Sequence, residues 1–180
     1  MEKNVTYIAL FAALIAALGL IPKIDLISGV PITAQSLGIM LCGTVLGAKR
    51  GALAVLLFLA LVAIGLPLLS GGRGGYAVFL GPSAGFLIGF PVAAFVTGWI
   101  VERWQTNLFL SAFVASFAGA IVVLYAFGIP GMATVLGKTL PEATLLATPF
   151  LAGDLIKCAL AALITRAIAQ MRPGALLSRN

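Results

Sequence analysis

The chain has 180 residues, of which 62% are hydrophobic and 9% are charged, and its net charge is +6. A soluble domain contains roughly half apolar and a quarter charged residues, so this composition excludes a water-soluble protein and predicts an all-α integral membrane protein with a single domain, residues 1–180. The sequence has no histidine, which removes the commonest general base and the commonest metal ligand. We therefore expect no catalytic residue and no metal site.

Six apolar segments follow one another along the chain, separated by proline, glycine and charged residues. They predict six transmembrane helices packed in one bundle. Segment 128–148 is too long and too apolar for a plain loop, so a short interfacial or re-entrant helix is expected around 132–138. The predicted spans, each near the roughly 20 residues that cross the hydrocarbon core, are about 5–21, 33–48, 51–69, 82–101, 108–127 and 149–171.

The cationic residues indicate the orientation of this bundle. An even number of spans places both termini on one side, and the segments of that side hold most of the Lys and Arg residues, which predicts that both termini are cytoplasmic. The charges are scattered singly between apolar segments, so they do not indicate a nucleic-acid partner. The cytoplasmic set is Lys3, Lys49, Arg50, Arg103, Arg166, Arg172 and Arg179, and the outer set is Lys23, Arg73 and Lys138.

The segment SGGRGGYAVFLGPSAG, residues 70–85, combines six glycines with one arginine between two apolar spans. Four hypotheses could explain this segment: first a phosphate cradle, second an RNA-binding Arg-Gly-Gly segment, third a ligand lid, and fourth an ordinary tight turn. No G-x-x-x-x-G-K-[ST] motif occurs in the sequence and the segment is predicted to lie outside, which argues against the first. A single Arg-Gly-Gly unit outside the cell argues against the second. The lid and the turn remain.

Several polar residues occur where an apolar helix would not need them. Asp154 and Lys157 are three residues apart, so they lie on one face of the sixth span. A charge inside the membrane is costly and indicates a functional site by default, although a purely structural ion pair is the alternative. Gln35 and Ser36 open the second span on the same outer side as Arg73, and helix capping is their alternative role. Together these residues predict an outer pocket for a small anionic molecule with N–H donors and hydrocarbon parts.

The first span carries a stripe of small residues. Alanine at spacings of three and four lets another helix approach closely in lipid. We interpret the stripe as the interface for a partner helix, and packing inside the bundle is the alternative. The stripe consists of Ala9, Ala12, Ala13, Ala16 and Ala17.

Three stretches of the chain resemble the BioY family, the biotin-binding S components of energy-coupling-factor (ECF) transporters. The resemblance extends over most of the chain and implies a six-helix bundle that binds biotin near its outer face. By motif it implies that Arg73, Asp154 and Lys157 are the polar contacts and that Tyr76 and Phe86 form walls around the ring system. The stretches are GVPITAQSLGIMLCGTVLGAKRG, GLPLLSGGRGGYAVFLGPSAGFLIGF and GDLIKCAL.

The chemistry of biotin agrees with these residues. Its ureido ring has two N–H donors and one carbonyl, and its valerate tail ends in a carboxylate. A carboxylate such as Asp154 suits the ureido N–H groups, and Lys157 or Arg73 suits either the ureido oxygen or the tail. Relatives often have Asn after the family's Gln, where this chain has Ser36.

The resemblance also implies partners and a location. It assigns the alanine stripe to a membrane coupling subunit (T component), which works with two ATPase subunits in a bacterial plasma membrane. This chain has no nucleotide motif, so ATP is expected to be used only by the partners, and biotin is the transported ligand rather than a cofactor. The alternatives are an S component for a different vitamin, a stand-alone biotin transporter, and a membrane enzyme, which the lack of histidine disfavours.

Overall fold

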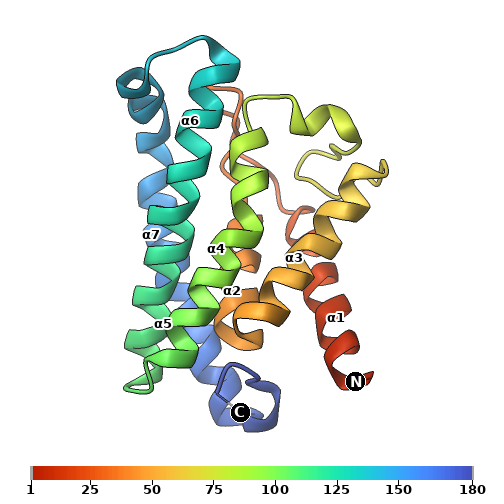
Figure 1. The fold of residues 1–180 in the computed structure, drawn as a ribbon, viewed down its shortest axis with the longest axis vertical. Helices are drawn as coiled ribbons and strands as arrows, with labels where there is room; N and C mark the ends of the chain where they lie inside the picture. Colours follow the sequence, from red (N-terminus) through yellow and green to blue (C-terminus); the bar gives the residue numbers. More distant parts are fainter. Residues whose placement is uncertain (1, 180) are drawn as a thin grey trace.

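The computed structural model describes residues 2–179, and all of its regular elements are helical. Six helices make up the bundle (Figure 1), as predicted, because α5, the π-helical segment η2 and α6 run as one continuous helix, Leu108–Leu136. Two short 3₁₀ segments complete the chain. The elements are α1 (Glu2–Leu18), α2 (Gln35–Leu46), α3 (Ala48–Ala63), η1 (Tyr76–Phe79), α4 (Ala84–Arg103), α5 (Leu108–Phe117), η2 (Ala118–Val123), α6 (Leu124–Leu136), α7 (Leu140–Met171) and η3 (Pro173–Ala175).

Three helices of the described chain are long and apolar enough to cross a membrane: α4, the continuous helix Leu108–Leu136, and α7. Helix α2 is different, with 12 residues, or about 18 Å at 1.5 Å per residue. All but one of its residues are buried, and it contacts α1, α3, α4 and α7. Its continuous hydrophobicity therefore reflects a position inside the bundle, with neighbouring helices rather than lipid around it.

The prediction of a separate helix around 132–138 is wrong, and so are the proposed limits of the last two spans. Helix α6 continues to Leu136, and α7 starts at Leu140 with a capping box between Thr139 and Glu142. The helices pass through Pro130 and Pro149, where the sequence pattern predicted breaks. Proline is tolerated in membrane helices because neighbouring helices and local adjustments satisfy the freed backbone groups.

The third span is also shorter than expected. Helix α3 ends at Ala63 rather than at residue 69, and Gly65 follows with a φ of 109°, which a side chain would strain. The residues that the prediction placed in the helix instead begin the 64–83 connection. This connection then returns to α4 and forms part of the site described below.

Close packing of α4 against α6 depends on glycine. A Cβ atom on Gly85 would lie 2.4 Å from the Phe127 carbonyl oxygen, and one on Gly131 would lie 2.6 Å from the Gly85 Cα atom. Only glycine fits at such a contact, and close helix approach supplies the van der Waals packing that associates helices in lipid. The Gly-Pro-Ser-Ala-Gly motif thus fixes α4 against α6 at the end of the bundle where the site lies.

The two ends of the bundle differ. Both termini lie at the same end (Figure 1), and the 19–34, 64–83 and 137–139 connections lie at the other. At the end with the termini, the tail after α7 folds back onto the bundle: Ser178 donates its backbone N–H to Val45 at 2.9 Å and its hydroxyl to the Thr44 carbonyl at 2.6 Å. Leu176 and Ser178 are each 4% exposed, so the tail closes this end.

Candidate ligand-binding site

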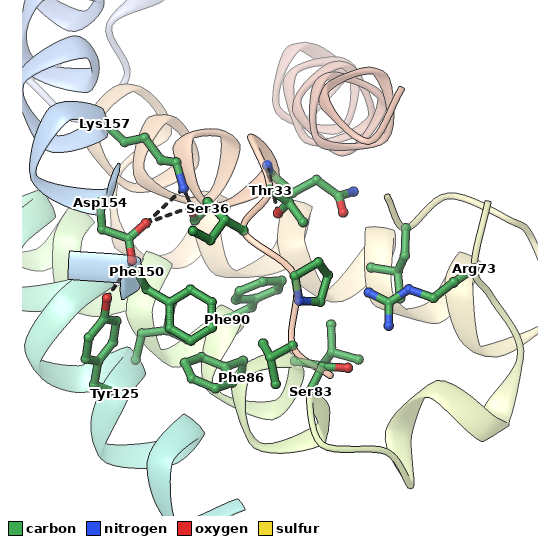
Figure 2. A pocket seen from close by; sticks show the side chains of 17 residues that line it. Thr33, Ser36, Arg73, Ser83, Phe86, Phe90, Tyr125, Phe150, Asp154 and Lys157 are labelled. Carbon is green, nitrogen blue, oxygen red and sulfur yellow. Dashed lines mark hydrogen bonds and ion pairs between the residues drawn. The ribbon is translucent and has the colours of Figure 1, made fainter. Parts of the chain in front are cut away.

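A cavity opens at the end of the bundle opposite the termini (Figure 2). Residues of the 19–34 connection, the first turn of α2, the 64–83 connection, α4, α6 and α7 line it. Of the predicted site residues, it brings together Gln35, Arg73, Phe86, Asp154 and Lys157. Helix ends and connections from distant parts of the sequence therefore converge as the pocket prediction required.

A hydrogen-bonded cluster around Asp154 forms one side of the cavity. Lys157 Nζ lies 2.9 Å from Asp154 Oδ1, and the side chains are 13% and 8% exposed. Ser36 donates its hydroxyl to the same carboxylate oxygen at 3.3 Å and accepts from Lys157 Nζ at 2.9 Å. Tyr125 donates to Asp154 Oδ2 at 2.8 Å. The carboxylate and the ammonium thus compensate each other, with two hydroxyl groups beside them.

Aromatic rings occupy the middle of the cavity. Phe86 makes edge-to-face contacts with Tyr125, at a centroid distance of 6.2 Å, and with Phe150, at 5.9 Å. Phe86 lines the cavity where the prediction placed a wall residue, and Phe90 stands one helical turn further along α4. Rings in such pairs prefer this geometry and are held in defined orientations, so the wall is preorganised for a flat apolar group.

Arg73 lies on the opposite side of the cavity from Asp154 (Figure 2). A tight turn presents it: Leu69 and Arg73 exchange two backbone hydrogen bonds of 3.0 and 3.2 Å. Gly71 and Gly72 make the turn with φ values of 80° and 69°, which only glycine adopts easily. Arg73 uses its Nε to bond the Ser70 carbonyl at 3.3 Å. The glycine-rich segment therefore forms a tight turn whose Arg73 lines the cavity, and its role as a ligand lid stays a prediction.

Gln35 lies in the wall with its amide engaged by backbone groups. Its Nε2 donates to the carbonyl oxygens of Ile15 at 3.1 Å and Leu68 at 3.0 Å, and its Oε1 accepts from Ser70 N at 3.1 Å. At 2% exposure, it ties α1 and the 64–83 connection to the first turn of α2. This arrangement favours a positioning role for Gln35, and direct ligand contact stays a prediction.

Tyr76 does not line the cavity. It lies on η1 and is 71% exposed, because the turn that directs Arg73 inward carries the next residues outward. The role of Tyr76 as a wall around the ligand stays a prediction that this geometry does not favour. Val30, Pro31 and Ile32 of the 19–34 connection occupy the wall instead.

Tyr125 and Phe150 are site residues that sequence reasoning missed. Phe150 lies one helical turn before Asp154 on α7, so the helical period could have indicated it. Tyr125 follows the π-helical segment Ala118–Val123, and an isolated phenol in an apolar helix needs a hydrogen-bond partner. The need for such a partner could have indicated Tyr125 as a site residue.

The structure divides the alanines of α1 between two faces, which corrects the prediction of one stripe. Ala12 is 3% exposed and Ala16 is half-buried, so both pack toward the bundle. Ala9, Ala13 and Ala17 are exposed at intervals of four residues. Only these three of the five alanines form an outward small-residue face. The sequence could not separate the two faces, because in lipid both faces of a helix can be apolar.

The lining of the cavity suits an elongated molecule that is polar at both ends. The Asp154 cluster offers one acceptor and several donors, Arg73 offers a cation, and aromatic and aliphatic groups lie between them. Within residues 2–179 no group of three His, Cys, Asp or Glu side chains is placed to hold a metal ion. The arrangement of polar and apolar groups is suited to binding a small molecule.

Comparisons with known proteins identify the family of this chain. A model of the BioY family matches residues 2–174. The chain is 56% identical to a biotin transporter BioY of Rhodobacter capsulatus over 100% of both chains, and 42% identical to a probable biotin transporter BioY of Bacillus subtilis over 93% of this chain and 90% of that one. The crystal structure of an S-component for biotin from an ECF-type ABC transporter superimposes with a TM-score of 0.90 at 32% identity, covering 94% of this chain and 92% of that chain. This chain belongs to the BioY family.

Proposed function

We propose that this protein is the membrane subunit that captures biotin for uptake, and that biotin binds in the cavity between Asp154 and Arg73. The observation that carries the proposal is the distribution of polar groups in the cavity, with a carboxylate and an ammonium at one side, a guanidinium at the other and aromatic rings between. Family membership and the names of the relatives support it. The same relatives are transporters, which disfavours the membrane-enzyme alternative.

The ureido ring fits the Asp154 side of the cavity. Its N–H groups can donate to the carboxylate, and its carbonyl can accept from Lys157, Ser36 or Tyr125, which lie within hydrogen-bond distance of one another or of Asp154. A site built to bond such groups rejects analogues that lack them, because its own buried polar groups are then left unpaired. Asp154 is therefore assigned to the ureido N–H groups.

The valerate carboxylate fits Arg73. Lys157 is already bonded to Asp154 and Ser36, whereas the terminal nitrogens of Arg73 face the cavity from the other side and bond no described residue. A guanidinium matches a carboxylate with two parallel hydrogen bonds. Two or three charge-assisted bonds contribute about 1.5–3 kcal/mol each. Together with burial of the ring and chain they are enough for nanomolar affinity, a binding free energy of about −12 kcal/mol.

The proposed orientation places the cavity outside and both termini in the cytoplasm of a bacterial cell, with the protein in the plasma membrane. It is supported by seven Lys and Arg residues assigned to the end with the termini against three at the other, in agreement with the positive-inside rule. Capture from the outer side follows from this arrangement.

Delivery inward is proposed to need a membrane coupling subunit and two ATPase subunits, because the chain has no nucleotide-binding motif. The exposed face of α1 formed by Ala9, Ala13 and Ala17 is the proposed contact for the coupling subunit. The alternative of stand-alone transport predicts uptake by this chain in a host without coupling proteins.

Binding measurements with the purified protein test the ligand. Calorimetric titration with biotin, thiamine, riboflavin, folate and pantothenate is expected to show nanomolar binding for biotin alone. Tight binding of another vitamin would indicate an S component of different specificity. The Asp154→Asn variant is the matched control, because it replaces the carboxylate with an amide of the same size and should weaken the binding of biotin.

A further inference from the structure

A second cavity lies at the other end of the bundle, far from the site described above. Its walls come from the start of α3, the end of α4 and the tail after α7. The tail supplies Leu177, Ser178 and Arg179, so the cavity exists because the tail folds back. Neither Asp154 nor any other residue of the first cavity lines it.

Positive charge dominates this cavity. Four cations line it together with a single carboxylate, Glu102, which accepts a hydrogen bond from the backbone N–H of Ala48 at 2.9 Å. The two ion pairs found within residues 2–179, Lys23–Asp25 and Lys157–Asp154, lie elsewhere. The four cations, none of which forms an ion pair with a described residue, are Lys49, Arg50, Arg103 and Arg179.

Two of the guanidinium groups are held in place by neutral groups, and neither forms an ion pair with a described residue. Arg50 donates to the Leu177 carbonyl at 3.3 Å, and Arg179 donates to the Trp104 carbonyl at 3.0 Å and to Ser111 at 2.6 Å. The Nε of Arg179 is buried without a hydrogen-bond partner among the described residues, and burial lowers the pKa of its guanidinium. Partly desolvated cations are costly unless they are paired, and a single carboxylate faces four cations here, so an external anion would stabilise this end.

Exposed apolar faces of two helices lead to this cationic cavity. On α4, Ile88, Val92, Phe95 and Trp99 are exposed at intervals of three and four residues, and Arg103 follows one turn later with its guanidinium 5.4 Å from the Trp99 ring centre. On α3, the exposed Leu53 and Leu56 share a face with Lys49. Each face thus joins apolar surface at membrane depth to cations at the membrane surface.

We propose that this cavity binds the phosphate of an acidic phospholipid, whose acyl chains lie along the exposed faces of α3 and α4. A phosphate anion is the chemistry that the cations recognise, and a soluble phosphate could supply it as well. The continuous apolar faces favour the lipid, since a soluble anion would make no use of them. Basic pockets beside membrane helices bind acidic headgroups in this way. The bound lipid would join the tail to α3 and α4.

Tryptophan fluorescence tests the proposal directly. The sequence has two tryptophans, so a Trp104→Phe background leaves Trp99, which lines the cavity. The protein is placed in phosphatidylcholine vesicles that contain brominated phosphatidylglycerol or, in parallel, brominated phosphatidylcholine. We expect stronger quenching by the brominated phosphatidylglycerol, which measures the preference for the acidic lipid.

Charge variants identify the residues responsible. The double substitution Lys49→Gln and Arg103→Gln is expected to reduce the lipid preference about 10- to 30-fold, since each cation near the surface contributes about fivefold. The matched control, Lys3→Gln with Arg172→Gln, removes two cations of the same end that do not line the cavity, and its preference should stay that of the parent. Biotin affinity should be unchanged in both, which separates this proposal from the proposed function.

Four outcomes would overturn the proposal. Equal quenching by the two brominated lipids in the parent protein would show no headgroup preference. An equal loss in the control variant would show a general charge effect. Loss of the preference in millimolar inorganic phosphate, but not in sodium chloride of the same ionic strength, would identify a soluble phosphate as the occupant. If the Lys49→Gln and Arg103→Gln variant keeps its lipid preference but co-purifies less with partner subunits, this face is a protein interface instead.

Discussion

Replacing Arg73 by Gln tests which cation meets the biotin carboxylate. The substitution removes the charge and keeps a polar side chain that can still bond the Ser70 carbonyl, as Arg73 Nε does at 3.3 Å. Because the turn is held by the backbone hydrogen bonds between Leu69 and position 73, the loop should keep its shape. The expected effect is therefore on the ligand and not on the fold.

The size of the effect follows from the environment of Arg73. Hydrogen bonds to charged groups contribute about 1.5–3 kcal/mol, or roughly 10- to 150-fold in affinity. Arg73 is half-buried, and solvent weakens the interaction of a partly exposed charge. We therefore expect the lower part of this range, a loss of about 10- to 30-fold for biotin.

Calorimetric titration with two ligands separates the carboxylate from the rest of the molecule. Biotinamide has a neutral tail, so Arg73→Gln should weaken biotin binding while changing biotinamide affinity by less than about threefold. Lys138→Gln is the matched control, because Lys138 lies at the same end of the bundle outside the cavity. Equal losses for the two ligands in Arg73→Gln would show that Arg73 acts on the loop. No loss for biotin would assign the carboxylate to Lys157.

Three further predictions follow from the same structure. Asp154→Asn should weaken biotin binding tenfold or more in calorimetry while the protein still purifies, because the Lys157 ammonium loses its partner. Replacing Ala9 and Ala13 by Leu should leave biotin affinity intact and abolish co-purification with the coupling subunit, and retained co-purification would remove α1 from that interface. In intact cells on a cysteine-free background, an impermeant thiol reagent should label a cysteine at position 72 and not one at position 105, and the reverse pattern would invert the orientation.

Local sequence spacing was enough to predict the contact between Asp154 and Lys157, but not the Tyr125 hydroxyl that also bonds Asp154. Asp154 and Lys157 are three residues apart, and this spacing alone puts them on one helix face. Phe86 lies in the wall as expected. Arg73 was predicted to lie near this pair because all three residues were placed on the outer side of the membrane. Most positions at one end of a six-helix bundle lie close together.

Helix limits were harder to predict, because the rules for proline change in a membrane. A proline inside a soluble helix costs about 3 kcal/mol and usually ends it, and the same rule placed breaks at Pro130 and Pro149. In the structure both lie inside helices. The predicted interfacial helix at 132–138 is absent for this reason, since residues 132–136 complete α6 and the connection to α7 follows.

Burial could not be predicted from apolar periodicity. In a soluble protein the apolar face of a helix is the buried face, but here lipid and core are both apolar. Ala12 and Ala13 look alike in sequence, yet one is 3% exposed and the other faces outward. The folded tail was missed for a related reason: Ser178 is buried through hydrogen bonds to α2 that no local pattern indicates.

The central claim is that biotin spans the cavity from Asp154 to Arg73, and a crystal structure of the protein with biotin bound tests it most directly. The account predicts the ureido ring within hydrogen-bond distance of Asp154, the bicyclic ring against Phe86, and the valerate carboxylate at Arg73. A reversed ligand, with the carboxylate at Lys157 and the ureido ring near the glycine turn, would contradict it, as would density for biotin outside this cavity.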